Sequence, residues 1–168
     1  GDAEEVLRHG ADKISINSPA LERPEFITEL ARRFGSQCVV VGVDSKRAEG
    51  GFGVYQYTGR PGSAVLAAMT MTEWGRQAQE RGAGEVVLNC MDADGVGGGY
   101  DLEQLAAARQ RLSIPLIASG GARMIEHFAQ AFSAGADGAL AAGVFHRGEL
   151  TIGQVKAGLK EKGAHVRL

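Results

Sequence analysis

The sequence predicts an α/β fold, a partial (β/α)₈ barrel of parallel strands with flanking helices. The first indication is an internal repeat, because Gly10-Ala11-Asp12 recurs as Gly135-Ala136-Asp137, 125 residues later. In both copies glycine follows the end of an amphipathic helix, and a short apolar run typical of a buried parallel strand comes next. Half of a barrel of roughly 250 residues has about this length. We therefore expect a duplicated barrel whose front end is missing, forming a single truncated domain over residues 1–168.

Composition supports this class and limits the function. Glycine accounts for 25 of 168 residues and aromatic residues for only 6%, a balance that fits an α/β protein with many tight turns. The net charge of −2 offers no basic surface for nucleic acid or an anionic membrane. There is no signal-peptide pattern and no apolar run of roughly 20 residues, so we expect a cytoplasmic protein. Cys38 and Cys90 lie in apolar runs, which favours buried free thiols over a disulfide or metal site.

The elements of the first half follow from local patterns along the chain. Residues 2–9 are typical of a helix, and KISIN at 13–17 is the first predicted strand. Pro24 and Gly35 bracket the next helix. The apolar run CVVVGVD at 38–44 predicts a second strand that ends on a carboxylate. Apolar and polar residues alternate within 46–60, which indicates a short excursion or hairpin.

The second half continues the alternation. A helix over 72–81 precedes the strand EVVLN at 85–89, and Asp101 with Gln104 predicts a capping box that opens the helix before the strand PLIAS at 115–119. A helix over 124–134 leads to the fifth strand at 138–142, and Thr151 with Gln154 predicts a cap for the last helix. Since strands and helices alternate without exception, we predict a parallel sheet with the five strands as consecutive neighbours.

Active-site groups in such barrels lie at the carboxyl ends of the strands. Asp44 ends an apolar strand, so its carboxylate can face a partly dry opening and act as a general acid or base. A loop cap, or an ion pair of Asp44 with Lys46 or Arg47, fits the same pattern about equally well.

In the loop 92–99, two carboxylates precede a glycine run. The later positions do not suit calcium, and we expect a mobile catalytic loop with Asp94 as its acid.

Small residues follow the last two predicted strands, as Ser119-Gly120-Gly121 and as Ala142-Gly143. Such residues let backbone N–H groups approach an anion, and barrels of this class commonly bind phosphate after strands seven and eight. The glycines could merely allow tight turns, but their presence after two adjacent strands favours phosphate binding. The four histidines have no metal-ligand spacing, and we expect neither a metal nor a cofactor.

Several segments together resemble the cyclase subunit of imidazole glycerol phosphate synthase, a lyase of histidine biosynthesis. They are GADKISIN, FGSQCVVVGVD, GAGEVVLNCMDADG, GYDLEQL, PLIASGGA, EHFAQAFSAGADGALAAGVFH and the closing VRL. The resemblance covers the whole chain and implies the third helix and strands four to eight of a (β/α)₈ barrel. It also implies a reaction in which ammonia from a glutaminase partner converts a bisphosphorylated ribulosyl aminoimidazole carboxamide nucleotide. The products would be imidazole glycerol phosphate and aminoimidazole carboxamide ribotide.

The resemblance further implies roles for individual residues. Asp44 would be one of two catalytic aspartates, the other belonging to strand one, and Asp94 matches an important loop aspartate. One substrate phosphate would be bound by Asn17 and Ser18. The other would be bound by Ser119, Gly120, Gly121, Ala142 and Gly143, where Gly143 stands at a position that is commonly serine. Asn89, at a position that is often threonine, and Gly95 would belong to the substrate loop.

Three charged residues match the family's ammonia entrance and partner interface. Lys13 and Glu85 correspond to two of the four charged residues that ring the entrance at the bottom of the barrel. Asp12 corresponds to a residue that faces the glutaminase.

Two alternatives remain at this point. The sister phosphoribosyl isomerase of the same pathway is also a duplicated barrel with two phosphate sites, but EHFAQAF, GVFH and VRL fit the cyclase better. Alternatively, the chain is an inert fragment or an assembly module that retains only phosphate binding, because one carboxylate of an acid–base pair cannot run the reaction. Open barrel edges at 13–17 and 138–142 would also favour self-association.

Overall fold

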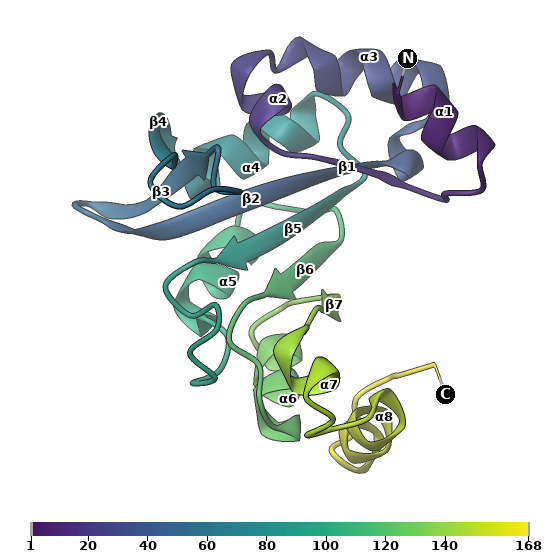
Figure 1. Ribbon diagram of the computed structural model, residues 1–168, viewed down its shortest axis with the longest axis vertical. Coiled ribbons are helices and arrows are strands. Elements are labelled where there is room, and N and C mark those ends of the chain that lie inside the picture. The colour runs from purple at the N-terminus through teal and green to yellow at the C-terminus, as the bar shows by residue number, and fades with distance from the viewer. Residues whose placement is uncertain (1, 168) are drawn as a thin grey trace.

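The computed structural model, which describes residues 2–167, contains an open sheet with helices packed along it (Figure 1). Within those residues the sheet has the strand order β4 (Val65–Thr70), β3 (Gly51–Gln56), β2 (Val39–Ala48), β5 (Glu85–Cys90), β6 (Leu116–Ser119) and β7 (Gly138–Ala139). A further strand, β1 (Ile14–Ile16), pairs with β2 outside this path. The protein therefore has an α/β fold with a mostly parallel sheet and flanking helices. The open sheet fits part of a barrel, which itself stays a prediction.

Five strands run parallel as consecutive neighbours, as the alternation predicts. They are β1 (Ile14–Ile16), β2 (Val39–Ala48), β5 (Glu85–Cys90), β6 (Leu116–Ser119) and β7 (Gly138–Ala139). The register sets Asp44 opposite Asn89, and Asn89 opposite Ser119. Three polar residues from three strands thus lie in one row at the carboxyl ends.

The last parallel strand is shorter than the predicted 138–142. The backbone N–H of Leu140 still donates to the carbonyl of Ala118 at 2.8 Å, but the ladder ends there. The chain then turns into the short helix α7 (Gly143–His146), which the sequence did not predict. The prediction of a strand as far as Ala142 is therefore wrong.

Strict alternation of strands and helices is also wrong, because β2, β3 (Gly51–Gln56) and β4 (Val65–Thr70) follow one another without a helix. They pair antiparallel, which confirms the hairpin expected within 46–60 and adds β4 to it. The prediction that the second strand ends at Asp44 is also wrong, because β2 begins at Val39 and continues to Ala48 to form the hairpin. Asp44 therefore lies within β2 and pairs with Tyr55 on one edge and with Asn89 on the other. β3 therefore lies along the same edge of β2 as β1 does, but pairs with a later part of that strand.

Helices cover one face of the parallel strands. The predicted ones are α1 (Asp2–Arg8), α3 (Glu25–Phe34), α4 (Met71–Glu80), α5 (Leu102–Arg109), α6 (Ile125–Ser133) and α8 (Ile152–Glu161); the short helix α2 (Ser18–Glu22) and the 3-10 turn η1 (Ser36–Cys38) were not predicted. The cap predicted at Thr151 is present and forms a capping box with Gln154. The capping box predicted at Asp101 is formed only in part: Asp101 accepts the backbone N–H of Gln104 at 3.1 Å, but the side chain of Gln104 donates to the Asp101 carboxylate. Both repeat glycines, Gly10 and Gly135, have φ +99, as a helix C-terminus requires.

The burial pattern separates the two faces of the sheet. In β5 and β6 the alternate residues Val86, Leu88, Leu116 and Ala118 are at most 2% exposed, and they belong to the same core cluster as Trp74 and Leu105 from the helices. The residues between them, including Asn89 and Ser119, are partly accessible on the opposite face. Because side chains alternate along a strand, the polar row lies on the face away from the helices.

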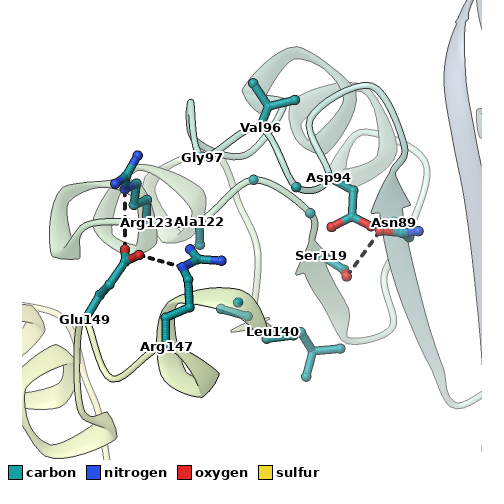
Figure 2. Close-up of a pocket in the computed structure, with 16 residues that line it drawn as sticks. Asn89, Asp94, Val96, Gly97, Ser119, Ala122, Arg123, Leu140, Arg147 and Glu149 are labelled. Atoms are coloured by element: carbon teal, nitrogen blue, oxygen red, sulfur yellow. Dashed lines mark hydrogen bonds and ion pairs between the residues drawn. The ribbon is translucent and has the colours of Figure 1, made fainter.

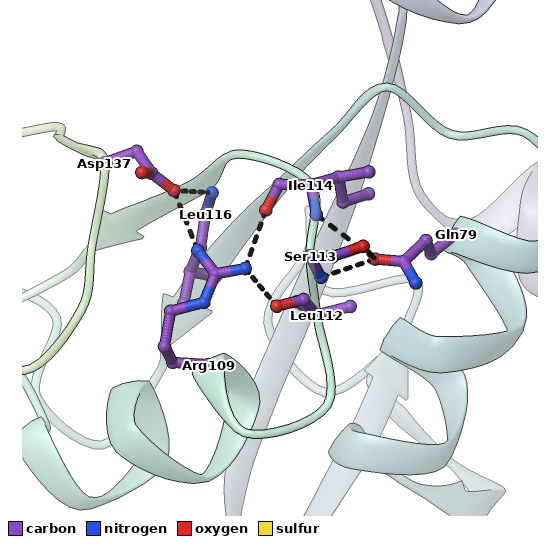
Figure 3. A network of polar contacts seen from close by, with 7 residues as sticks. All are labelled: Gln79, Arg109, Leu112, Ser113, Ile114, Leu116 and Asp137. Atoms are coloured by element: carbon purple, nitrogen blue, oxygen red, sulfur yellow. Dashed lines mark hydrogen bonds and ion pairs between the residues drawn. The ribbon is translucent and has the colours of Figure 1, made fainter.

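Hydrogen bonds of Arg109 connect the amino ends of β6 and β7 (Figure 3). From α5, its Nη1 donates to Oδ2 of Asp137 at 2.9 Å, and its Nη2 donates to the carbonyls of Leu112 and Ile114. Asp137 also accepts the backbone N–H of Leu116 at 2.9 Å. These bonds hold the start of β6 and so support the register that places Ser119 at the other end.

Candidate functional site

Asp44 is the centre of a polar cluster at the carboxyl ends of the parallel strands. Its side chain is 9% exposed. Nδ2 of Asn17 donates to Oδ2 of Asp44 at 2.8 Å, and Nδ2 of Asn89 donates to Oδ1 at 2.9 Å. The hydroxyl of Thr58 also donates to Oδ2, and the hydroxyl of Ser119 donates to Oδ1 of Asn89 at 3.3 Å. The carboxylate is therefore held in one orientation by three neutral donors.

The ion pair expected as an alternative for Asp44 is absent from the described residues. Arg47 instead forms ion pairs with Glu103 at 2.7 Å and Asp101 at 3.5 Å. The ammonium of Lys46 lies 5.9 Å from the ring centre of Tyr55. A fixed carboxylate with no cationic partner in residues 2–167 suits a group that exchanges a proton with a ligand.

A cavity of about 770 Å³ lies beside this cluster (Figure 2). It is formed by the loops that follow β5, β6 and β7. Eight of the residues predicted from the sequence line it: Asn89, Asp94, Gly95, Ser119, Gly120, Gly121, Ala142 and Gly143. The carboxylate of Asp94 points toward Asn89 and Ser119 in this view. The structure thus brings the predicted phosphate loops and the predicted acidic loop to one place.

The turn after β6 requires glycine. Gly120 and Gly121 have φ of +94 and +103, a left-handed conformation that other residues rarely adopt. A Cβ atom on Gly121 would lie 2.1 Å from the carbonyl oxygen of Gly99, whose own N–H donates to Gly121 at 2.9 Å. In residues 2–167 the backbone amides of Gly120, Gly121 and Gly143 donate no hydrogen bond. They remain available to an anion.

Two arginines and a glutamate complete the cavity, and sequence reasoning missed all three. Nε of Arg147 donates to Oε1 of Glu149 at 2.5 Å, and Nε of Arg123 lies 3.4 Å from Oε2 of Glu149. The only sequence signal for Arg147 is its position four residues after Gly143, one helical turn away.

The backbone at Leu140, another residue of the cavity, is held in place by Tyr100, whose hydroxyl donates to the Leu140 carbonyl at 2.8 Å. Burial raises the pKa of Tyr100, so this hydroxyl stays protonated.

Asn17 and Ser18, expected at the second phosphate, do not line this cavity. Asn17 contacts Asp44, whereas the hydroxyl oxygen of Ser18 accepts the backbone N–H of Tyr57 at 2.8 Å. Tyr57 adopts φ +58. Thr58, which follows it, contacts Asp44, so Ser18 helps to hold the loop that carries this donor.

The residues expected at the ammonia entrance lie at the opposite end of the strands. Lys13 precedes β1 and Glu85 begins β5; Nζ of Lys13 donates to Oε2 of Glu85 at 2.5 Å. Asp12 is exposed and forms no side-chain hydrogen bond or ion pair within the described part of the chain. The amino and carboxyl ends of the strands therefore carry separate polar groups.

Cys90 is buried, which raises the pKa of its thiol to about 12 and keeps it from acting as a nucleophile at neutral pH. Residues 2–167 contain no group of three His, Cys, Asp or Glu side chains arranged to hold a metal ion. Among the same residues, no helix has the length and apolar character needed to span a membrane.

Comparisons with known proteins agree on one family. A family model described as "Histidine biosynthesis protein" matches residues 1–151. The chain is 56% identical to the imidazole glycerol phosphate synthase subunit HisF of Maricaulis maris over 167 residues. It is 53% identical to the subunits of that name in Vibrio cholerae and Campylobacter jejuni. Each match covers 99% of this chain but 66% of the relative, so the chain spans just under two thirds of the length of these curated relatives.

Proposed function

Since the chain belongs to the histidine biosynthesis protein family, we propose that it supplies the cyclase chemistry of imidazole glycerol phosphate synthase. In this reaction ammonia reacts with a bisphosphorylated ribulosyl aminoimidazole carboxamide nucleotide. The products are imidazole glycerol phosphate and aminoimidazole carboxamide ribotide.

The observation that carries this proposal is the placement of Asp44. Its carboxylate is oriented by Asn17, Asn89 and Thr58 at the carboxyl ends of the strands, next to the cavity that the glycine loops form. We assign Asp44 as one general acid or base of the cyclisation. A positioned group of this kind contributes roughly 10²–10⁴-fold to a rate. Asp94, on the loop across the cavity, is the second acidic group near the substrate.

The substrate's two phosphates are assigned to the two sides of Asp44. Gly120, Gly121 and Gly143 offer free backbone amides to one phosphate, with Ser119 and Ala142 beside them. Asn17 and Ser18, on the other side, are assigned to the second phosphate. Asn89 and Gly95 contact the part of the substrate between them.

Ammonia is proposed to come from a glutaminase subunit that docks at the opposite end of the strands. Lys13 and Glu85 form an ion pair there, and the exposed carboxylate of Asp12 is available to the partner. This arrangement would deliver ammonia at the amino ends, while the substrate binds at the carboxyl ends.

Reconstitution tests the proposal. The 168-residue chain holds Asp44 but no match to the first catalytic aspartate of the resembled family, so by itself it is expected to show no turnover. The N-terminal third of the Maricaulis maris subunit, added as a separate fragment with an ammonium salt, should restore release of aminoimidazole carboxamide ribotide. Turnover by the chain alone, or none with the fragment bound, would contradict the assignment.

A further inference from the structure

The cavity contains a cationic side chain, that of Arg147, which lies next to Gly143. Arg147 follows α7, and its guanidinium points into the cavity (Figure 2). A Cβ atom on Gly143 would lie 2.6 Å from Nη1 of Arg147 and 3.3 Å from its Cζ. Gly143 does not have a positive φ, so its backbone conformation does not require glycine. The missing side chain instead provides the room that the guanidinium occupies.

The hydrogen bonds of Arg147 leave its outer nitrogens free. Nε donates to Glu149 at 2.5 Å, whereas Nη1 and Nη2 donate to no acceptor within residues 2–167. Glu149 also pairs with Arg123, so one carboxylate is shared by two guanidinium groups. This end of the cavity therefore carries a net positive charge. A guanidinium with two free terminal nitrogens matches the geometry of phosphate oxygens.

We propose that Arg147 is a phosphate-binding residue, and that Gly143 is glycine so that Arg147 can reach the phosphate. The ligand is a phosphate monoester dianion, held jointly by this guanidinium and by the backbone amides of Gly120, Gly121 and Gly143. The proposal rests on the proposed function, in which this cavity takes one phosphate of the substrate. A merely structural ion pair is the competing role, and the 58% exposure of the Arg147 side chain would make such a pair weak.

A titration with inorganic phosphate, followed through the NMR shifts of the Gly120, Gly121 and Gly143 amides, tests the assignment. Arg147→Gln should raise the Kd for phosphate about tenfold. Arg147→Lys should raise it about threefold, because lysine keeps the charge but cannot make the bidentate hydrogen bonds of a guanidinium. The matched control is Arg76→Gln. Arg76 is 54% exposed and pairs with Glu80 at 2.5 Å, but it lies on α4 outside this cavity. It should change the Kd less than about twofold.

The dependence of Arg147 on Gly143 is tested by comparing the phosphate Kd of the single and double variants. Gly143→Ala should weaken phosphate binding in the original chain, because the methyl group displaces the guanidinium, but it should add little to Arg147→Gln. An unchanged Kd in a folded Arg147→Gln chain, or effects of the two substitutions that simply add, would overturn the inference and leave the phosphate site intact. If phosphate shifts none of the three amides in the original chain, the phosphate site of the proposed function fails as well.

Discussion

Replacing Gly121 with alanine tests whether the turn after β6 depends on close backbone contact. Gly121 combines φ +103 with a position where Cβ would lie 2.1 Å from the carbonyl oxygen of Gly99. Gly10 is a matched control, because its φ is +99 and nothing lies within 4 Å of its would-be Cβ. The pair separates the conformational cost of alanine from the cost of the contact.

The expected magnitudes follow from these two terms. A left-handed conformation costs an alanine about 1–2 kcal/mol, and Gly10→Ala should lose only this amount. Gly121→Ala must in addition push the loop at Gly99 away and break the 2.9 Å hydrogen bond between Gly99 and Gly121, which adds about 1 kcal/mol for the bond and further strain. We therefore expect Gly121→Ala to lower the free energy of unfolding by about 3–4 kcal/mol.

The assay is urea unfolding followed by the fluorescence of Trp74, at one fixed protein concentration so that association does not alter the comparison. Trp74 is fully buried in the core and reports global unfolding. The same variant should lose the phosphate-induced shifts of the Gly120 and Gly143 amides. Equal losses of stability for the two alanine variants would refute the contact argument.

Two further predictions concern the thiols and the sheet edges. Burial raises the pKa of Cys90 to about 12, above the unfolded value of about 8.5. The contribution of the neutral thiol to stability is therefore complete below about pH 8.5 and lost as the pH rises toward 12. At pH 8 a thiol reagent should modify Cys38 in the native chain and Cys90 only after unfolding; equal native rates would contradict this. Within residues 2–167, β1 and β7 each pair on one edge only, so the chain should self-associate at micromolar concentration in sedimentation experiments, whereas a compact monomer would contradict open-edge pairing.

The parallel core could be predicted from the sequence because its signals are local. Apolar runs such as those at 38–44 and 85–89 mark buried strands, and the repeated Gly-Ala-Asp marks helix ends. The strand β4 could not be found in this way. Its sequence VLAAMT is rich in residues that favour helices, and its members are exposed or only partly buried. Its pairing with β3 forms it, and that contact is not visible in a local pattern.

The candidate site was predictable where a strand end fixes a residue's position. Ser119 ends β6, Asn89 lies one residue before the end of β5, and the register sets Asp44 of β2 opposite Asn89, so the three residues come together. Thr58 and Arg147 were missed for a different reason. Thr58 reaches Asp44 from a loop that the sequence leaves undefined, and the guanidinium of Arg147 occupies space next to Gly143 that a side chain there would take up.

The most direct test of the central claim is Asp44→Asn in the reconstituted assay. Asparagine keeps the shape of the side chain but cannot exchange a proton as a carboxylate does. Turnover should fall by at least about 100-fold. Inorganic phosphate should still shift the Gly120 and Gly121 amides with nearly the original Kd. Asp2→Asn is the control, because Asp2 is an exposed carboxylate in the first turn of α1 and does not line the cavity. Turnover by Asp44→Asn close to that of the control would contradict the assignment of Asp44 as the general acid or base.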